Sequence, residues 1–228
     1  MSTNLVQLHS VTRDRHDFSP FAQHLPDGVE PLPLDLLGHG DAPRASRYRV
    51  TDFAEAITLP TAGAVLFGHS LGGLVALELA RTRPALVRAV VLEDPPLFDS
   101  KQPRLDETPW ATGFRKMKAL MTGRGASWTR DEWLASAARW PSGHGRLSIE
   151  EAGGREAVER RADQVMKLDT ALIDAMLSPK LHTGFDVIDA IRAARCPITL
   201  LAGERAAGSA LSDEDLRLLA AEPNLSIV

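Results

Sequence analysis

The segment spanning residues 64–73 constrains the fold of this chain more than any other. It joins a short apolar run (64–67) to the pentapeptide Gly-His-Ser-Leu-Gly (68–72), and a run with helical character (74–80) follows at once. The pentapeptide alone is weak support, because Gly-x-Ser-x-Gly arises by chance in roughly one chain in ten of this length. Its setting predicts a strand, a sharp turn with Ser70 at its tip, and a helix.

This turn would hold the Ser70 side chain clear of the backbone. A side chain at Gly68 or Gly72 would collide where the strand and the helix pass closely, so both positions favour glycine. The hydroxyl of Ser70 would point into a cleft above the positive end of the helix, which suits a developing oxyanion. The segment therefore predicts a nucleophilic serine at the end of a buried strand.

Strand-like and helix-like runs alternate on both sides of a long interruption. This alternation predicts an α/β fold with a mainly parallel sheet and flanking helices. Strands are expected at residues 5–9, 29–36, around Val65, 89–92, 198–201 and 225–228, and helices at 18–25, 50–57, 74–83 and 212–222. A chain of 228 residues has room for one sizeable domain or for a domain with a large insertion.

Residues 95–195 interrupt the alternation with a helical insertion. Helices are expected there at 110–121, 129–140, 149–168 and 170–177, and all four tryptophans and four of the five methionines lie in this region. We predict that residues 1–94 form the first part of the α/β core and residues 196–228 its second part. In this prediction the end of the last strand and a final helix are missing.

Charge and apolar runs restrict the class of partner. The net charge of −4 gives no basic patch that would attract nucleic acid or an anionic membrane. The charge-rich segment 155–161 mixes both signs, which favours a solvated helix face over a binding surface. No window approaches the ~20 apolar residues of a membrane span. The N-terminus lacks an export signal, so a cytoplasmic protein is expected.

The single cysteine and the sparse glycines bear on redox and cofactor chemistry. Cys196 excludes an internal disulfide, suits a reducing compartment and precedes an apolar run (197–202), so a small buried side chain is expected there. The glycines at 38, 40, 72 and 73 are too sparse for a phosphate-binding fingerprint. We expect a small-molecule substrate as the partner, and neither a cofactor nor a metal.

Five motifs, in this order along the chain, resemble those of the α/β-hydrolase fold family, in the branch with a helical cap inserted into a parallel sheet. The resemblance covers essentially the whole chain outside residues 95–195. The motifs are Leu-His-Ser-Val (8–11), similar to a His-Gly turn; Asp-Leu-Leu-Gly-His-Gly (35–40); the nucleophile elbow (68–72); Leu-Glu-Asp-Pro-Pro (92–96); and Gly-Glu-Arg-Ala (203–206), where many members carry their acid.

The resemblance implies a reaction and the residues that perform it. In this family the serine attacks an acyl carbon, a histidine takes its proton, and an Asp or Glu orients the histidine. By position, Ser70 is the nucleophile, and the backbone N–H groups of Leu71 and Val11 form the oxyanion hole. Ser10 stands where the family usually has glycine, which puts the aim of the Val11 N–H in question.

A second departure from the family concerns the acid. The usual position, three residues past Gly203, is Ala206, which cannot orient an imidazole. Some members, resembling haloalkane dehalogenases, supply the acid one strand earlier, and this alignment implies Asp94. A one-residue shift gives Glu93, and Glu204 is a more distant alternative. Asp94 as a capping or turn residue before Pro95 is the structural alternative.

A third departure concerns the histidine, which follows the last strand in this family. No histidine lies beyond His182, so we expect the catalytic histidine to lie beyond Val228 and the chain to be incomplete. Structural or surface roles are expected for the histidines present. These are His9 and His39 in turn motifs, His69 before the nucleophile, His16 and His24 beside a helix, and His144 and His182 in the insertion.

The resemblance implies a serine hydrolase acting on a small ester, lactone, thioester or activated ketone. Tryptophan and methionine in the insertion indicate an apolar substrate or a core between its helices. Serine at the elbow argues against dehalogenase and epoxide-hydrolase chemistry, which needs a carboxylate nucleophile. A non-catalytic small-molecule binding or regulatory protein is the alternative, favoured by Ser10, Ala206 and the absent histidine. The retained turn at Ser70 speaks against it.

Overall fold

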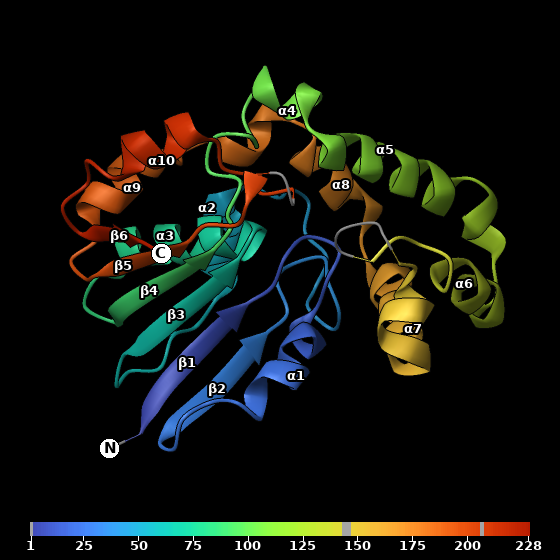
Figure 1. Ribbon diagram of the computed structural model, residues 1–228, viewed down its shortest axis with the longest axis horizontal. Helices are drawn as coiled ribbons and strands as arrows, with labels where there is room; N and C mark the ends of the chain where they lie inside the picture. The colour runs from blue at the N-terminus through green and yellow to red at the C-terminus, as the bar shows by residue number, and fades with distance from the viewer. Residues whose placement is uncertain (1, 143–146, 206–207) are drawn as a thin grey trace.

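The computed structural model describes residues 2–142, 147–205 and 208–228. In this part of the chain six parallel strands form one sheet in the order β2-β1-β3-β4-β5-β6 (Figure 1). The strands are β1 (Thr3–Leu8), β2 (Val29–Leu34), β3 (Ala64–His69), β4 (Val87–Glu93), β5 (Ile198–Leu201) and β6 (Leu225–Ile227). The predicted α/β class and parallel sheet are confirmed.

The strand order follows from the side chains. β1, β3 and β4 carry apolar residues that are buried in the main core, as expected for strands covered on both faces. β2 contains Pro31 and Pro33, which lack the N–H that a second neighbouring strand would need. Because β2 lies at the edge of the sheet and pairs only with β1 among the described strands, these prolines cost no ladder hydrogen bond.

The central helix α3 (Leu71–Thr82) packs against β1, β3 and β4. It also contacts α2 (Val50–Ala56) and α9 (Val187–Ala193), so these three helices form one layer on the sheet. All residues of α3 from Leu71 to Ala80 are buried, because strands and helices surround it. This burial fixes the start of α3, and with it the position of Ser70.

Shorter helices complete the sheet layers. A 3₁₀ turn (Arg15–Phe18) and α1 (Ser19–Ala22) follow β1, where one longer helix was expected at 18–25. The helix α10 (Asp213–Leu219) begins at the predicted cap, because Ser212 accepts from the Asp215 N–H and Asp215 bonds back to the Ser212 N–H. Cys196 is buried, as expected.

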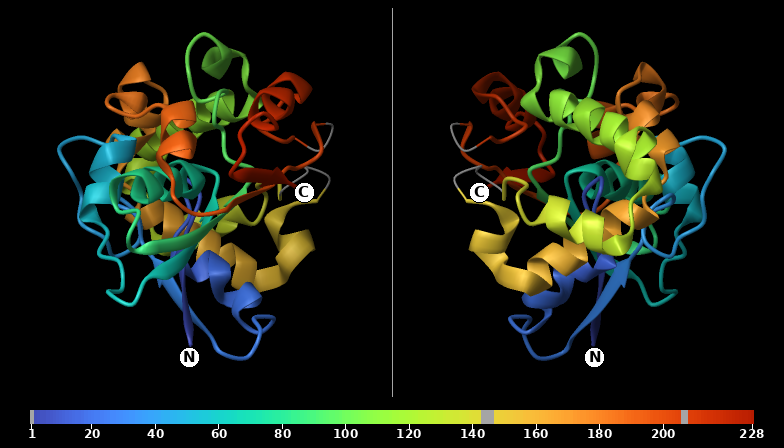
Figure 2. Two further views of the ribbon diagram at one scale, coloured as in Figure 1. Left: turned by 90° about the vertical axis from the view of Figure 1, so that its left-hand side faces the viewer. Right: turned by 90° about the vertical axis from the view of Figure 1, so that its right-hand side faces the viewer.

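Between β4 and β5 the described chain is helical, and its helices α4 to α8 lie beyond the carboxyl ends of the central strands, whereas α9 packs on α3 (Figures 1 and 2). Its elements are α4 (Arg104–Glu107), α5 (Pro109–Thr122), a 3₁₀ turn (Arg124–Ser127), α6 (Arg130–Ala137), α7 (Ile149–Lys167), α8 (Thr170–Met176), a 3₁₀ turn (Pro179–His182) and α9. The sequence pattern did not indicate α4 or α9. α7 is kinked at Gly154, whose φ is 62°.

Two apolar cores hold this insertion. A small core between α6 and α7 is formed by Trp133, Ala137, Val158, Ala162 and Val165. The last helix, α9, belongs instead to the main core, to which it contributes Val187, Ala190 and Ile191. None of the described helices has the length and apolar character needed to cross a bilayer.

Candidate active site

Ser70 occupies the turn between β3 and α3, as the sequence predicts. Its backbone has φ 52° and ψ −115°, a conformation that residues other than glycine adopt at a cost. The Ser70 N–H donates to the Glu93 carbonyl at the end of β4 (3.0 Å), and the Ser70 carbonyl accepts from the Gly73 N–H (2.9 Å). These two hydrogen bonds hold the strained turn in place at the carboxyl end of the sheet.

The two glycines of the pentapeptide are required by close backbone approach. A Cβ atom at Gly68 would lie 2.4 Å from the Gly72 carbonyl oxygen. One at Gly72 would lie 2.0 Å from the carbonyl oxygen of Leu8, the last residue of β1. The end of β1 therefore lies against the first turn of α3, which brings the loop after β1 close to Ser70.

Two backbone N–H groups near this turn are available to a ligand. Leu71 is the first residue of α3, so its N–H has no intrahelical acceptor, and the Ser70 side chain does not cap the helix. Val11 lies in a turn closed by the Arg13 N–H and the Ser10 carbonyl (3.2 Å). Its N–H donates to no protein acceptor within the described residues, so Ser10 in this turn leaves the Val11 N–H unengaged.

Two buried histidines fix the loop that carries Val11. The His9 Nε2 accepts from the Leu36 N–H (3.0 Å), and the His39 Nε2 accepts from the Thr12 N–H (3.2 Å). The rings pack edge to face, with centroids 4.8 Å apart. Burial lowers the pKa of His9, and burial together with the neighbouring His9 lowers the pKa of His39 to about 3. Both rings are therefore neutral acceptors with a structural role.

Asp94 follows β4 directly, one strand away from Ser70. It has φ 41°, and its N–H donates to the Leu201 carbonyl (3.0 Å). The carboxylate accepts from the Ser209 hydroxyl (2.6 Å) and from the Ala210 N–H (3.2 Å). Asp94 is thus held in a strained conformation between β4 and the loop after β5.

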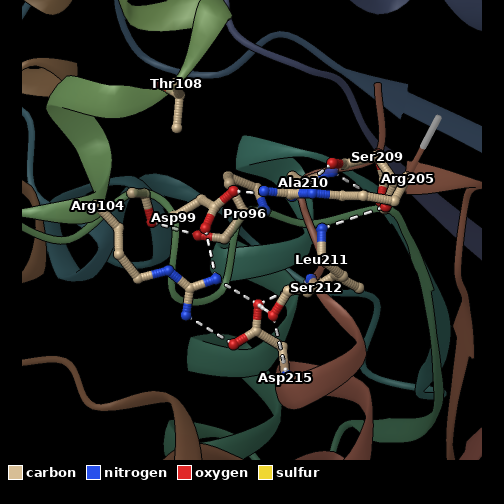
Figure 3. A network of polar contacts seen from close by, with 12 residues as sticks. Pro96, Asp99, Arg104, Thr108, Arg205, Ser209, Ala210, Leu211, Ser212 and Asp215 are labelled. Atoms are coloured by element: carbon tan, nitrogen blue, oxygen red, sulfur yellow. Dashed lines mark hydrogen bonds and ion pairs between the residues drawn. The ribbon is translucent and has the colours of Figure 1, made fainter. Parts of the chain in front are cut away.

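Ion pairs in turn hold the loop that binds Asp94 (Figure 3). Arg205 donates to the Ser209 carbonyl (2.8 Å) and to Asp99 (3.1 Å). Arg104 bridges Asp99 (2.6 Å) and Asp215 at the start of α10 (2.7 Å). The carboxylates of Asp99 and Asp215 are almost fully buried, and their hydrogen bonds to the guanidinium groups are charge-assisted, which makes them stronger than bonds between neutral groups. They join α4, α10 and the Ser209 loop around Asp94.

The other candidate acids lie differently. The side chains of Glu93 and Glu204 are exposed, and neither makes a hydrogen bond or ion pair with another described residue. Ala206 lies outside the described residues. Of the three acids considered from the sequence, Asp94 is therefore the one that the surrounding structure positions.

The remaining histidines are also placed, apart from His144, which lies outside the described residues. His69 is the last residue of β3 and is half-buried. His182 is half-buried and its Nε2 lies 2.9 Å from the hydroxyl of the buried Ser100, while desolvation lowers its pKa to about 4. His16 and His24 are exposed on the surface. None of the described histidines makes a hydrogen bond with the Ser70 side chain.

A cavity of about 830 Å³ lies between α5, α7 and the loop after β1. Its volume is that of a pocket for a small molecule. Trp110, Trp140 and Met117 are among its walls, whereas Trp133 is buried in the small core. The cavity begins at Thr12, the residue after Val11; Ser70 and Asp94 are not among its walls.

A second, smaller cavity of about 310 Å³ lies on the Asp94 side. It is bounded by Asp99, Arg104, Arg205 and Ser209, the residues of the ion-pair network, and by Trp110, which it shares with the large cavity. The large cavity thus lies next to the loop that carries Val11, and the small one next to Ser209, which binds Asp94.

One expectation about the insertion is wrong in part. The segment 155–161 was expected to be a solvated helix face, and Arg155 is exposed as expected. Arg161, however, is only 8% exposed and lines the large cavity. Sequence reasoning also missed Ser209. Mixed charge cannot show which arginine faces inward, and Ser209 lies in a loop without a repeating pattern.

Several known proteins are similar to this chain in sequence. The family model described as "Alpha/beta hydrolase family" matches residues 8–227. The lipase LipV of Mycobacterium tuberculosis is 38% identical over 96 residues, which cover 40% of this chain and 36% of that protein. A pimeloyl-[acyl-carrier protein] methyl ester esterase of Neisseria meningitidis is 38% identical over 86 residues, covering 37% and 34%. These matches thus span about a third of each relative's length.

Solved structures show the same fold at lower sequence identity. A marine microorganism esterase superposes with a TM-score of 0.71 at 18% identity, covering all of this chain and 86% of its own. At that identity the likeness concerns the fold alone. The match of the family model over nearly the whole chain shows that this protein belongs to the alpha/beta hydrolase family.

Proposed function

We propose that this protein is a serine hydrolase in which Ser70 is the nucleophile, Asp94 the acid, and the N–H groups of Val11 and Leu71 the oxyanion hole. The observation that carries the proposal is the backbone of Ser70, strained at φ 52° between a buried strand and a buried helix. Strain of this kind persists where the surroundings impose it, and it is concentrated at functional sites.

In the proposed reaction the Ser70 Oγ attacks the acyl carbon while a histidine takes the hydroxyl proton. The N–H groups of Val11 and Leu71 stabilise the oxyanion. The leaving group departs with that proton when its bond to the acyl carbon breaks, which leaves an acyl-serine; this bond is carbon–oxygen or carbon–sulfur in an ester, lactone or thioester and carbon–carbon in an activated ketone. Water then attacks the acyl carbon, gives one proton to the histidine and releases the acid as Ser70 recovers its proton. Asp94 orients the imidazole and stabilises the imidazolium.

The proton acceptor is not assigned to His9, His39 or His182. The rings of His9 and His39 accept hydrogen bonds from backbone N–H groups, and the ring of His182 is hydrogen-bonded to Ser100. The proposal therefore requires a histidine other than these three. It also requires that the acceptor reach both Ser70 and Asp94.

The proposed substrates are small esters, lactones, thioesters or activated ketones with an apolar part. The wall of the large cavity, with Trp110, Phe114 and Met117, supports the apolar part. The relatives named as a lipase and a methyl ester esterase support ester hydrolysis. We further propose that the helices of residues 95–195 act as a cap over the site, with α4 to α8 above the strand ends and α9 anchored on α3.

A covalent probe tests this proposal without knowledge of the substrate. A fluorophosphonate phosphorylates an activated serine, so mass spectrometry of the labelled full-length protein should find the adduct on Ser70. S70A should abolish both labelling and turnover of p-nitrophenyl acetate. S127A, which changes an exposed serine remote from the turn, should leave both unchanged. Labelling that persists in S70A, or no labelling of the folded wild-type protein, would favour a binding protein instead.

A further inference from the structure

The large cavity holds a buried cation that the proposed reaction does not use. Arg161 extends from α7, and its side chain is fully enclosed at 8% residue exposure. One guanidinium nitrogen donates to the Thr12 carbonyl and the other to the Thr12 hydroxyl (3.1 Å). The guanidinium carbon lies 5.6 Å from the centre of the Trp140 ring. Five N–H donors are present on a guanidinium, so these contacts leave several donors for a further acceptor.

Arg161 forms no ion pair in the described part of the chain, where the buried Asp52, Asp99, Asp215 and Glu222 each pair with an arginine. The carboxylates of Asp14 and Asp17 favour its charged form without contacting it. The residues outside that part (1, 143–146, 206 and 207) include no aspartate or glutamate. Desolvation, with the like charge of Arg13, lowers the pKa of Arg161 to about 9, so the group is still a cation at neutral pH. A buried charge without a partner is costly.

The surroundings of Arg161 favour an anion. Arg13, Lys116 and Arg160 also line the cavity, and Asp17 is the one acid among its described walls. Asp17 already accepts from Gln164 (2.8 Å) and lies 3.6 Å from Arg13. Most of the remaining wall is aromatic or aliphatic. Arg160 pairs with Glu156 (3.5 Å), so Arg161 and Lys116 are the cations of this wall that make no ion pair with another described residue. The cavity therefore combines positively charged side chains with an apolar wall.

We propose that Arg161 binds a carboxylate of the substrate, so that the preferred substrates are acyl compounds that carry a carboxylate and an apolar part. A planar guanidinium can bind a carboxylate through two parallel hydrogen bonds. That the bound carboxylate belongs to a substrate rests on the proposed function. The binding of an anion by Arg161 does not depend on it.

The position of Arg161 relates this carboxylate to the reacting group. Arg161 binds Thr12, and Val11 is the residue before it, with Cα atoms ~3.8 Å apart across one peptide bond. If the Val11 N–H faces the reacting carbonyl, the carboxylate site lies a few bond lengths from the reaction centre. Arg161 then selects acyl compounds in which a short chain separates the carboxylate from the reacting carbonyl.

Binding tests the site independently of catalysis. Isothermal calorimetry of the full-length protein with linear dicarboxylates of four to eight carbons, and with their dimethyl esters, compares anionic and neutral probes of equal length. At least one dicarboxylate should bind about 10- to 100-fold more tightly than its dimethyl ester. R161Q should remove this preference. R155Q, on an exposed arginine of the same helix, should keep it.

Hydrolysis tests the link to the reaction. The ratio of kcat/KM for a mono-p-nitrophenyl dicarboxylate to that for the p-nitrophenyl ester of the unsubstituted acid should fall about 10- to 100-fold in R161Q. The ratio is used because loss of the Thr12 contacts can lower turnover of both esters. An equal loss on both esters, with no preference for dicarboxylates in the wild type, would overturn the proposal.

Three further outcomes are decisive. If R161Q does not fold, a crystal structure of the wild-type protein with the tightest dicarboxylate replaces it, and a carboxylate bound away from Arg161 refutes the inference. If dicarboxylates bind through Arg161 but S70A retains full activity, the anion site stands and the proposed function fails. If S70A is inactive and R161Q alters neither binding nor the ratio, the function stands and the inference fails.

Discussion

The assignment of Asp94 as the acid can be tested by D94N. The amide keeps the volume of the carboxylate but removes its charge and turns one oxygen into a donor. That donor would face the Ala210 N–H, which now lies 3.2 Å from Oδ2 and 3.3 Å from Oδ1. The bond from the Ser209 hydroxyl to Oδ1 (2.6 Å) can persist. We therefore expect a stability loss of only about 1 kcal/mol, or ~2–4 °C in Tm for a chain of this size.

Turnover should change far more than stability. Replacing the acid of a Ser-His-Asp site by the amide lowers kcat by about 10⁴-fold, because the imidazole takes the wrong tautomer and the imidazolium loses its stabilisation. We expect about 10³- to 10⁴-fold for D94N with p-nitrophenyl acetate. The side chains of Glu93 and Glu204 are exposed and make no hydrogen bond or ion pair with a described residue, so E93Q and E204Q should remain within about twofold of wild type.

The assay compares kcat and the thermal melting of these three variants in the full-length protein. A folded E204Q that is inactive, beside a D94N that turns over normally, would show that the acid lies on the loop after β5. A D94N that loses activity only because it unfolds would show as a large drop in Tm. Asp94 would then be a structural residue and not the catalytic acid.

Two further predictions concern the fold around the site. G72A should prevent soluble expression or lower Tm sharply, because its Cβ would lie 2.0 Å from the Leu8 carbonyl oxygen, whereas G113A has open space in α5 and should gain ~0.5–1 kcal/mol. A tolerated G72A would contradict the close packing of β1 and α3. His39 binds a proton more weakly when folded (pKa about 3) than when unfolded (6.5), so stability is retained above pH 6.5 and falls as the pH drops below it. Between pH 8 and 5 this group should cost about 2 kcal/mol in urea unfolding, and an unchanged pH dependence in H39Q would refute that role.

The sequence determined much of the fold through local rules. Residues 64–73 predicted the strand, turn and helix around Ser70, because glycine tolerates the close approach that Gly68 and Gly72 now show. The capping pair Ser212 and Asp215 predicted the start of α10, since both partners lie within one helical turn. The alternation of apolar runs predicted a parallel sheet. Each of these signals depends on residues near one another in the chain.

Tertiary structure decided what depends on residues far apart in the chain. Asp94 is distinguished from Glu93 and Glu204 only by Ser209 and Ala210, more than a hundred positions later. Arg161 is buried because Thr12, far from it in sequence, lies against α7. The mixed-charge sequence around Arg161 is typical of a solvent-exposed helix face. Local patterns fix secondary structure through backbone geometry, whereas the environment of a charged side chain depends on which distant surfaces the fold brings against it.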